Sequence, residues 1–426
     1  MNKPILVFKF GGASVKDGDA IINVVRILER YNTHNILLVV SAMGKTTNSL
    51  EHTFQAFMER DLDVFTERLT VLNNYHTEII NSLFKPQEAG KLRNELQLIF
   101  NQIAEYFNED ITIPRAQLYD GFISFGELIS SKILQCKIEM DLGLSKWIDT
   151  RTNILTDDLF QKANVQWPNS IKAIRKQCLP ALEKHGILVT QGFIAANQDG
   201  KTTTLGREGS DYSAAIFAHA LESESVTIWK DVPGMLNADP KFFKDTIKLD
   251  RISFREAIEL SYYGASVIHP KTLKPLQNKK IPLLVKSFTA PDEPGTIIDV
   301  DTSNDHMVPS FIFKKNQVLF SITPKDFSFL IEANLSDIFS KLSEAKAEIN
   351  IMQNSALSFS FLIDHDPMKI ASILDILNTN YEVKYNTDLE LVTVRHYDKK
   401  TNEFVCQNKK ILLQQRTRNT ARFVLA

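Results

Sequence analysis

The chain has 426 residues, of which 43% are hydrophobic and 23% charged, and its formal net charge is −2. This length suggests two or three domains, and the near-neutral balance excludes both a strongly basic nucleic-acid-binding protein and a highly acidic disordered one. The three cysteines form no Cys-x-x-Cys pair, and no apolar stretch approaches the ~18 residues of a membrane span. We expect no metal site, no nucleic-acid or membrane partner, and a cytoplasmic location.

The first part of the chain alternates strands with helices. Residues 5–10 are an expected strand that stops at a Gly-Gly pair, a helix follows over about 17–29, and a second apolar strand covers 36–40. Because both strands are apolar throughout, they are typical of a parallel sheet covered on both faces. Residues 49–108 then carry apolar side chains at helical spacing.

The alternation continues to about residue 300. Further strands are expected at 186–190, 226–230 and 281–285, and further helices at 210–221 and 254–262. This rhythm predicts an α/β fold with a mainly parallel sheet over residues 1–304.

A polar, turn-rich segment at 291–305 ends this rhythm. The elements expected after it are strands at 318–322, 349–352, 357–363 and 390–395, with helices at 335–342 and 367–377. Their order, β-α-β-β-α-β, is the ferredoxin-like arrangement. We therefore predict a second domain over residues 305–426.

Lys9 is the second-to-last residue of the first expected strand, and a Gly-Gly loop follows that strand. A P-loop does not fit the chain, because Gly44-Lys45 would need a glycine at position 39, which is Val. The dinucleotide fingerprint does not fit either, because no two of the sixteen glycines are two positions apart. Paired glycines let backbone N–H groups approach a phosphate, although a Gly-Gly pair alone is most often only a turn.

Two later segments strengthen the phosphate interpretation. Residues 202–215 join a glycine-containing loop to a helix start, which favours an anion, and Arg207 offers a planar fork for a carboxylate. Ser210 and Asp211 can also simply cap that helix. In the segment 229–240, Asp231 follows a strand directly, a position suited to nucleotide contacts.

Together these segments resemble the aspartate kinases of the amino acid kinase superfamily, in order through residue 300 or so. The motifs that carry the resemblance are KFGGASV from Lys9, VSAMG from Val40, FGE from Phe125, QGF from Gln191, TLGREGSDY from Thr204, KDVPG from Lys230 and GASVIHP from Gly264. The resemblance implies a carbamate-kinase-like three-layer sandwich. It also implies two C-terminal ferredoxin-like ACT modules at about 315–364 and 366–426. Nothing after residue 426 supplies a homoserine dehydrogenase, so we expect none fused to this chain.

The implied reaction is the ATP-dependent phosphorylation of L-aspartate to 4-phospho-L-aspartate, with Mg²⁺, as the first step toward lysine, threonine and methionine. By resemblance, Lys9 contacts the ATP phosphates and Asp211 organises this catalytic lysine. The implied aspartate-binding residues are Ser41, Thr47, Glu127 for the amino group and Arg207 for the α-carboxylate. The implied nucleotide-binding residues are Lys9, Gly11, Gly12, Ser14, Lys230, Asp231, Leu236, Lys241, Ser266 and Val267.

The chemistry of the acceptor agrees with these residue types. A side-chain carboxylate with a reference pKa of about 3.9 is already ionised at pH 7, so no general base is required. The difficulty is the approach of two anions, and cations, Mg²⁺ and backbone N–H groups must neutralise that charge.

Three positions depart from the family pattern. Ala13 stands where Thr is frequent, Leu236 where an aromatic residue is frequent, and Ser266 where many members have a Lys facing the phosphates. We hypothesise that Lys271 reaches the phosphates in place of that lysine, with Lys230 as the alternative.

The C-terminal region resembles regulatory ACT modules. The weak effector-site candidates are Asn334, Asn350 and Ser355. Asn350 and Ala356 replace positions where lysine-sensitive members often have Asp and Glu, and a desolvated lysine ammonium without carboxylate partners is costly. We therefore predict weak or absent lysine inhibition and leave the effector open. The second module is at least as well explained as a packing and dimerisation unit, and a homodimer or higher oligomer is expected.

Two other functions compete with this one. Another amino acid kinase would act on acetylglutamate, glutamate or a nucleoside monophosphate, and the combination of Glu127, Arg207 and ACT modules argues against it. An amino-acid-sensing protein with a degenerate kinase domain would explain Ser266 and Leu236, but the presence of Lys9, Asp211, Asp231 and Arg207 argues against that reading.

Overall fold

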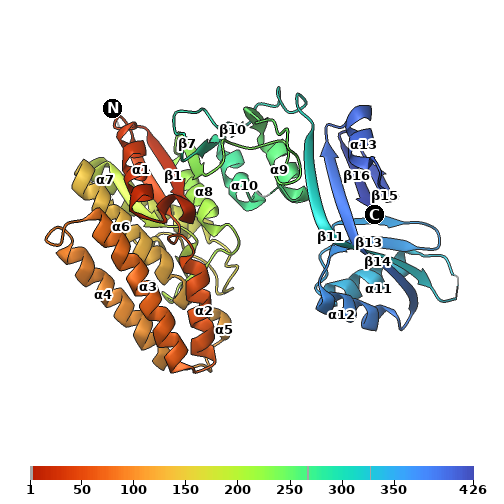
Figure 1. Ribbon diagram of the computed structural model, residues 1–426, viewed down its shortest axis with the longest axis horizontal. Helices are drawn as coiled ribbons and strands as arrows, with labels where there is room; N and C mark the ends of the chain where they lie inside the picture. Colours follow the sequence, from red (N-terminus) through yellow and green to blue (C-terminus); the bar gives the residue numbers. More distant parts are fainter. Residues whose placement is uncertain (1–2, 266–267, 327) are drawn as a thin grey trace. The chain divides into compact units, whose positions relative to one another are not determined.

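The computed structural model describes residues 3–265, 268–326 and 328–426, and the chain forms two compact units (Figure 1). The first unit holds the described residues of 1–235, 248–258 and 267–305, and the second those of 236–247, 259–266 and 306–426. The domain boundary near residue 305 stays a prediction. Within the described ranges, no helix is both long and apolar enough to cross a membrane.

An eight-stranded sheet forms the centre of the first unit, in the order β3-β4-β2-β1-β7-β9-β10-β8. Its strands are β1 (Ile5–Phe10), β2 (Asn35–Val40), β3 (Ser145–Trp147), β4 (Ile187–Gln191), β7 (Ser225–Lys230), β8 (Arg251–Ser253), β9 (Leu283–Ser287) and β10 (Thr296–Asp299). All neighbours run parallel except β9 and β10. The predicted mainly parallel α/β sheet is confirmed.

Alternate residues of the central strands face two different layers of helices. Phe8 and Leu38 belong to a core shared with α1 (Gly18–Glu29), α3 (Leu62–Leu83) and α6 (Phe125–Leu142). Val7 and Val39 are fully buried outside that core, because successive side chains of a strand point to opposite faces. Helix α8 (Gly209–Leu221) packs on β1, β2 and β7, and contacts α7 (Trp167–His185) and α10 (Pro270–Lys279). The predicted three-layer sandwich is confirmed.

The long helical stretch expected at 49–108 forms several helices that extend the first core. The remaining elements of this part of the chain are α2 (Thr46–Met58), α4 (Gly90–Glu105), α5 (Arg115–Ile123), α9 (Phe254–Tyr263) and the antiparallel pair β5 (Ile194–Ala196) and β6 (Thr202–Thr204). Short 3₁₀ turns lie at Gly12–Val15, Tyr106–Asn108 and Thr150–Thr152.

The second unit is built on one antiparallel sheet of six strands, in the order β12-β13-β11-β14-β16-β15. Its elements are β11 (Ser310–Pro324), α11 (Glu332–Glu344), β12 (Ile351–Asn354), β13 (Phe359–Asp364), α12 (Pro367–Leu377), β14 (Tyr381–Arg395), α13 (Lys399–Cys406), β15 (Ile411–Arg416) and β16 (Thr420–Leu425). Helices α11 and α12 share a core with β11 and β13. The antiparallel sheet with its helices agrees with the ferredoxin-like ACT expectation.

Two strands of this sheet are longer than the sequence predicted. The strands expected at 318–322 and 390–395 are the centre of β11 and the end of β14. The alternation is masked because the β11–β14 register shifts between Lys314 and Leu319, where Asn316 has a left-handed φ of 54°. The sequence did not predict β15, β16 and α13, which are short elements of 6, 6 and 8 residues.

Candidate active site

A cavity of about 730 Å³ opens in the first unit, and strand ends and helix starts supply its charged groups. Lys9 comes from the end of β1 and Lys230 from the end of β7, while Glu127 and Asp211 lie in the first turns of α6 and α8. In parallel α/β sheets, ligands bind at the carboxyl ends of strands, where helix N-termini also point. The topology thus brings together residues that are more than 200 positions apart.

One end of the cavity, which we call the phosphate end, holds a row of three charged side chains. Lys9 Nζ lies 2.8 Å from Asp211 Oδ1, and Lys230 Nζ lies 3.6 Å from Asp211 Oδ2. Lys9 and Asp211 are buried. Because Asp211 holds two ammonium groups, one on either oxygen, it fixes their spacing and leaves this row with one excess positive charge for an anion.

The Gly-Gly loop packs tightly beneath this row. A Cβ atom at Gly12 would lie 2.8 Å from the Ala42 carbonyl oxygen and 2.9 Å from that of Gly44, so only glycine allows this approach of backbone to backbone. The Gly44 N–H donates to the Gly12 carbonyl at 3.0 Å. Gly11 precedes the short 3₁₀ turn, and Ser14 is buried within it.

Glu127 is a buried carboxylate with one oxygen unpaired among the described residues. Its Oε1 accepts from the Ala42 N–H at 3.2 Å, and its Oε2 has no hydrogen-bond partner there. Burial raises the pKa of the Glu127 carboxyl to about 8, against the lowering by the Ala42 N–H and Lys9. A buried carboxyl group of this kind, lining a cavity, is poised to ionise when it receives a cationic group of a ligand.

The other predicted aspartate-binding residues line the same cavity. Ser41 follows β2, Thr47 lies in the first turn of α2, and Arg207 precedes α8. Ser41 is held by its backbone: its N–H donates to Phe10 at 3.1 Å and its carbonyl accepts from Ser130 Oγ at 2.7 Å. Arg207 is exposed and forms no salt bridge with a described residue. The cavity therefore holds a cationic fork and an unpaired carboxyl together.

Several lining residues were not predicted from the sequence. They are Glu51, Tyr119, Gln161, Lys162, Phe193 and Glu208. The Tyr119 hydroxyl donates to Glu51 Oε1 at 2.5 Å, and burial together with Glu51 raises the pKa of Tyr119. The spacing of Thr47 and Glu51, one helical turn apart, is a sequence signal for Glu51, but it does not indicate the contact between Glu51 and Tyr119.

A buried carboxylate, Asp120, braces two segments of the cavity wall. Its Oδ2 accepts from the N–H groups of Gln161 and Thr204, both at 2.8 Å, and its Oδ1 accepts from Thr204 Oγ1 at 2.9 Å. Burial raises the pKa of Asp120 and these hydrogen bonds oppose the rise. Asp120 therefore fixes the chain just before Arg207.

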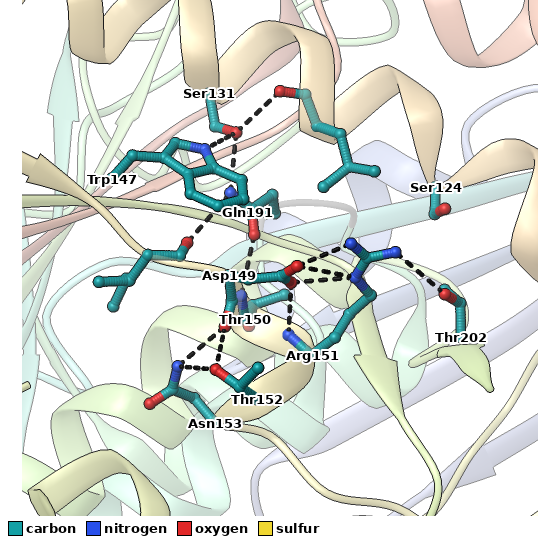
Figure 2. A network of polar contacts seen from close by, with 12 residues as sticks. Ser124, Ser131, Trp147, Asp149, Thr150, Arg151, Thr152, Asn153, Gln191 and Thr202 are labelled. Atoms are coloured by element: carbon teal, nitrogen blue, oxygen red, sulfur yellow. Dashed lines mark hydrogen bonds and ion pairs between the residues drawn. The ribbon is translucent and has the colours of Figure 1, made fainter. Parts of the chain in front are cut away.

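A second network holds the end of β4 (Figure 2). The Gln191 amide accepts from the Thr150 N–H at 2.9 Å and donates to Ser131 Oγ at 2.8 Å, which also accepts from the Trp147 indole. Beyond it, a Cβ atom at Gly192 would lie 2.6 Å from Ser210 Cβ, so the start of α8 rests directly on this glycine. The network thus positions Phe193 and the α8 N-terminus at the cavity.

The remaining predicted nucleotide residues lie elsewhere. Asp231 is exposed just after β7. Leu236 and Lys241 belong to the second unit, where Leu236 is half-buried and Lys241 is exposed, with its N–H on Asp239 at 2.9 Å. Ser266 and Val267 lie outside the described residues.

Lys271 does not line this cavity. It is the second residue of α10 and lines another cavity, with Trp167 and His219. The helical phase of α10 turns its side chain toward α8 and α7, which the spacing from Ser266 could not indicate. His269 caps α10 by accepting from the Lys271 N–H at 3.1 Å.

The effector candidates of the second unit occupy separate places. Asn334 lines a cavity of about 450 Å³ with Asp337 and Tyr381, while Ser355 closes a turn with Ser358. Asn350 joins a polar cluster instead: its Oδ1 accepts from Lys314 Nζ, and its Nδ2 donates to Gln317 and Asp364, all at 2.8–2.9 Å. No group of three or more His, Cys, Asp or Glu side chains among the described residues could hold a metal ion.

Comparisons with known proteins agree on the family and the fold. The profile described as the amino acid kinase family matches residues 4–287. The chain is 31% identical to the lysine-sensitive aspartokinase 3 of Escherichia coli (strain K12), over 92% of this chain and 86% of that protein. A chloroplastic bifunctional aspartokinase/homoserine dehydrogenase 2 of Arabidopsis thaliana is 27% identical over 88% of this chain, which spans only 42% of that longer protein.

A solved structure of similar fold is that of E. coli aspartokinase III in complex with aspartate and ADP. Its TM-score against this chain is 0.82 at 28% identity, and the match covers 99% of this chain and 96% of that one.

Proposed function

Because this chain belongs to the amino acid kinase family and, within it, to the aspartokinases, we propose that it transfers the γ-phosphoryl group of ATP to the side-chain carboxylate of L-aspartate. The product is 4-phospho-L-aspartate, which starts the biosynthesis of lysine, threonine and methionine. The observation that carries the proposal is one cavity that holds both the Lys9–Asp211–Lys230 row and the unpaired Glu127 carboxyl.

Recognition of aspartate uses the groups of the cavity that have no strong partner among the described residues. The aspartate ammonium pairs with Glu127, which ionises on contact because an opposite charge lowers its pKa. Arg207 takes the α-carboxylate as a bidentate pair. Ser41 and Thr47 orient the β-carboxylate toward the phosphate end. Glutamate, longer by one methylene, would place its carboxylate out of line.

Phosphoryl transfer then needs charge neutralisation rather than a base. The β-carboxylate is ionised and attacks the γ-phosphorus in line, while the bond to the ADP oxygen breaks. Lys9 and Lys230 neutralise the phosphate oxygens, and Asp211 keeps both ammonium groups in place. The N-terminus of α8 adds backbone N–H groups and its positive dipole.

Magnesium enters as part of the substrate MgATP. The carboxylate nearest the phosphate end, Asp211, is already held by two lysines, so the phosphates themselves are the main Mg²⁺ ligands. Bound Mg²⁺ supplies further neutralisation of the phosphate charge.

The direct test is ATP-dependent formation of aspartyl hydroxamate by the full chain. We expect activity with aspartate and MgATP, and at most a few per cent of that rate with glutamate. Complete inactivity, with aspartate binding retained, would favour an amino-acid sensor with a degenerate kinase domain, the reading that Leu236 and Ser266 motivated.

The second unit is proposed to regulate or assemble the enzyme as a homo-oligomer in the cytoplasm. The Asn350 amide is engaged by Lys314 from its own sheet, and no carboxylate stands at position 350 or 356 to hold a lysine ammonium. We therefore expect lysine to inhibit weakly or not at all, and inhibition by low lysine concentrations would overturn this. Light scattering of the purified chain measures the oligomer.

A further inference from the structure

A second cavity, of about 420 Å³, lies in the first unit where α7 and α10 flank α8. Its volume lies in the range of small-molecule sites. It is separate from the active-site cavity, because none of the described residues that line one lines the other. The segment 161–165 runs between them, with Gln161 and Lys162 on the first cavity and Ala163, Asn164 and Val165 on the second.

Each of the three helices turns one face toward this cavity. Helix α7 contributes Trp167 and Ile171, one turn apart, and α8 contributes Tyr212 and His219, two turns apart. Helix α10 contributes Lys271, Lys274 and Asn278. Residues three, four or seven positions apart lie on one side of a helix, so each helix lines the cavity with residues of a single face.

One side of the cavity is aromatic. The Trp167 indole stands edge-on to the His219 imidazole, with ring centroids 5.0 Å apart, and its centroid lies 6.5 Å from that of Tyr212. His219 Nδ1 is 2.9 Å from the Pro275 carbonyl. Since a carbonyl only accepts, Nδ1 carries a proton and donates, which fixes the orientation of the ring.

Among the described residues, the Asp, Glu, Arg and Lys side chains that line this cavity are all lysines, so its charge is positive. Lys271 and Lys274 are exposed lysines of the rim, and no Asp or Glu is among the lining residues. Neither lysine forms a salt bridge with a described residue, whereas Lys279 on the same helix pairs with Glu222 at 2.7 Å. Two unpaired ammonium groups beside an aromatic wall suit an anion that carries a flat ring.

We propose that this second cavity, defined by Trp167, Tyr212, His219, Lys271, Lys274 and Asn278, binds a small planar anion, in which an aromatic ring packs on Trp167 and a phosphate or carboxylate group meets the two lysines. The site does not depend on phosphoryl transfer, so its failure and that of the proposed kinase activity are separate results.

Binding is tested by the quenching of tryptophan fluorescence in the full chain. The probes are AMP for a phosphate source, benzoate for a carboxylate source, and adenosine as the uncharged control. We expect saturable binding of AMP or benzoate, and at least tenfold weaker binding of adenosine than of AMP. Trp167→Phe should abolish the signal, because the other indoles, Trp147 and Trp229, lie outside this cavity.

Matched lysine variants locate the binding. The double variant Lys271→Ala/Lys274→Ala should weaken the binding of the anionic probe at least tenfold. Lys176→Ala/Lys184→Ala removes the same charge from exposed positions of α7 away from the cavity and should leave it unchanged. The experiment is repeated on Lys9→Met, so that AMP bound in the active-site cavity is recognised by its loss there.

The preferred probe identifies the anionic group. Tighter binding of AMP indicates a phosphorylated ligand, and tighter binding of benzoate indicates a carboxylate. The proposal is overturned if neither anion binds saturably at millimolar concentration, if adenosine binds as tightly as AMP, or if the Lys271/Lys274 double variant binds like the wild type.

Discussion

The active-site cavity of the first unit and the Asn350 cluster of the second unit both gather buried or half-buried polar groups, but they differ in what is left unsatisfied. In the cavity, Glu127 Oε2 has no partner among the described residues. Around Asn350, the side-chain amide contacts Lys314, Gln317 and Asp364. The backbone carbonyl of Asn350 accepts from Arg422 Nη2 at 2.7 Å. Unsatisfied buried groups favour a ligand, and satisfied ones favour the fold.

The largest effect is expected at Lys9. Lys9→Met removes the buried cation nearest Asp211 and should lower kcat by about 10²–10³-fold, as the loss of one preorganised donor does elsewhere. Initial rates of hydroxamate formation measure this. The matched control Lys16→Met changes an exposed lysine and should keep the wild-type rate. Equal rates for wild type and Lys9→Met would show that Lys9 has no role in catalysis.

Glu127→Gln should weaken the recognition of aspartate without destabilising the fold. Loss of the carboxylate should lower kcat/KM for aspartate by about 10²-fold, in the range for a lost charged hydrogen bond. Glu51→Gln, which alters a carboxylate already paired with Tyr119, should cost less. If the two variants were equally impaired, the pairing state of the carboxylates would not matter.

Glu127→Gln should also stabilise the ligand-free protein against unfolding at alkaline pH. The unfolded chain loses the Glu127 proton near its ordinary pKa, while the folded chain retains it up to about pH 8. The folded state is therefore destabilised as pH rises between these values, and the cost persists above them. Thermal unfolding of Glu127→Gln against wild type should show a larger gain in Tm at pH 9 than at pH 5.

Asn350→Ala should lower the stability of the fold and leave the rate of phosphoryl transfer unchanged. The change leaves Lys314 and Asp364 without their amide partner and should cost about 1–3 kcal/mol. Urea unfolding measures this, with Asn354→Ala, an exposed position of β12, as the control. An Asn350→Ala protein of unchanged stability would show that the cluster contributes nothing to the fold.

The smallest effect in the active site is expected at Lys271. Because its side chain lines the second cavity, Lys271→Ala should leave the KM for ATP unchanged, while Lys230→Ala should raise it several-fold. Steady-state kinetics at saturating aspartate decide this. A raised KM for ATP in Lys271→Ala would restore the hypothesis drawn from Ser266.

The sequence predicted the groups that local motifs carry. Lys9 lies at the end of a strand and Asp211 in the first turn of a helix, so each could be placed from neighbouring residues. The Tyr119–Glu51 pair and the Asp120 brace could not be found, because they join helices and loops that meet only in the folded chain. Lys271 lines the second cavity because of the helical phase of α10, and a contact between Lys271 and the phosphates stays a prediction. In the second unit, the bulge near Asn316 hid the true length of β11.

The pairing of Glu127 with the aspartate ammonium is tested most directly by counting the protons released when aspartate binds. Calorimetry at pH 7 in two buffers of different ionisation enthalpy measures that number. Because the pKa of Glu127 in the empty cavity is about 8, it is mostly protonated at pH 7, and pairing with the aspartate ammonium should release close to one proton. Glu127→Gln should release none. Tight aspartate binding with no proton release by the wild type would contradict the account.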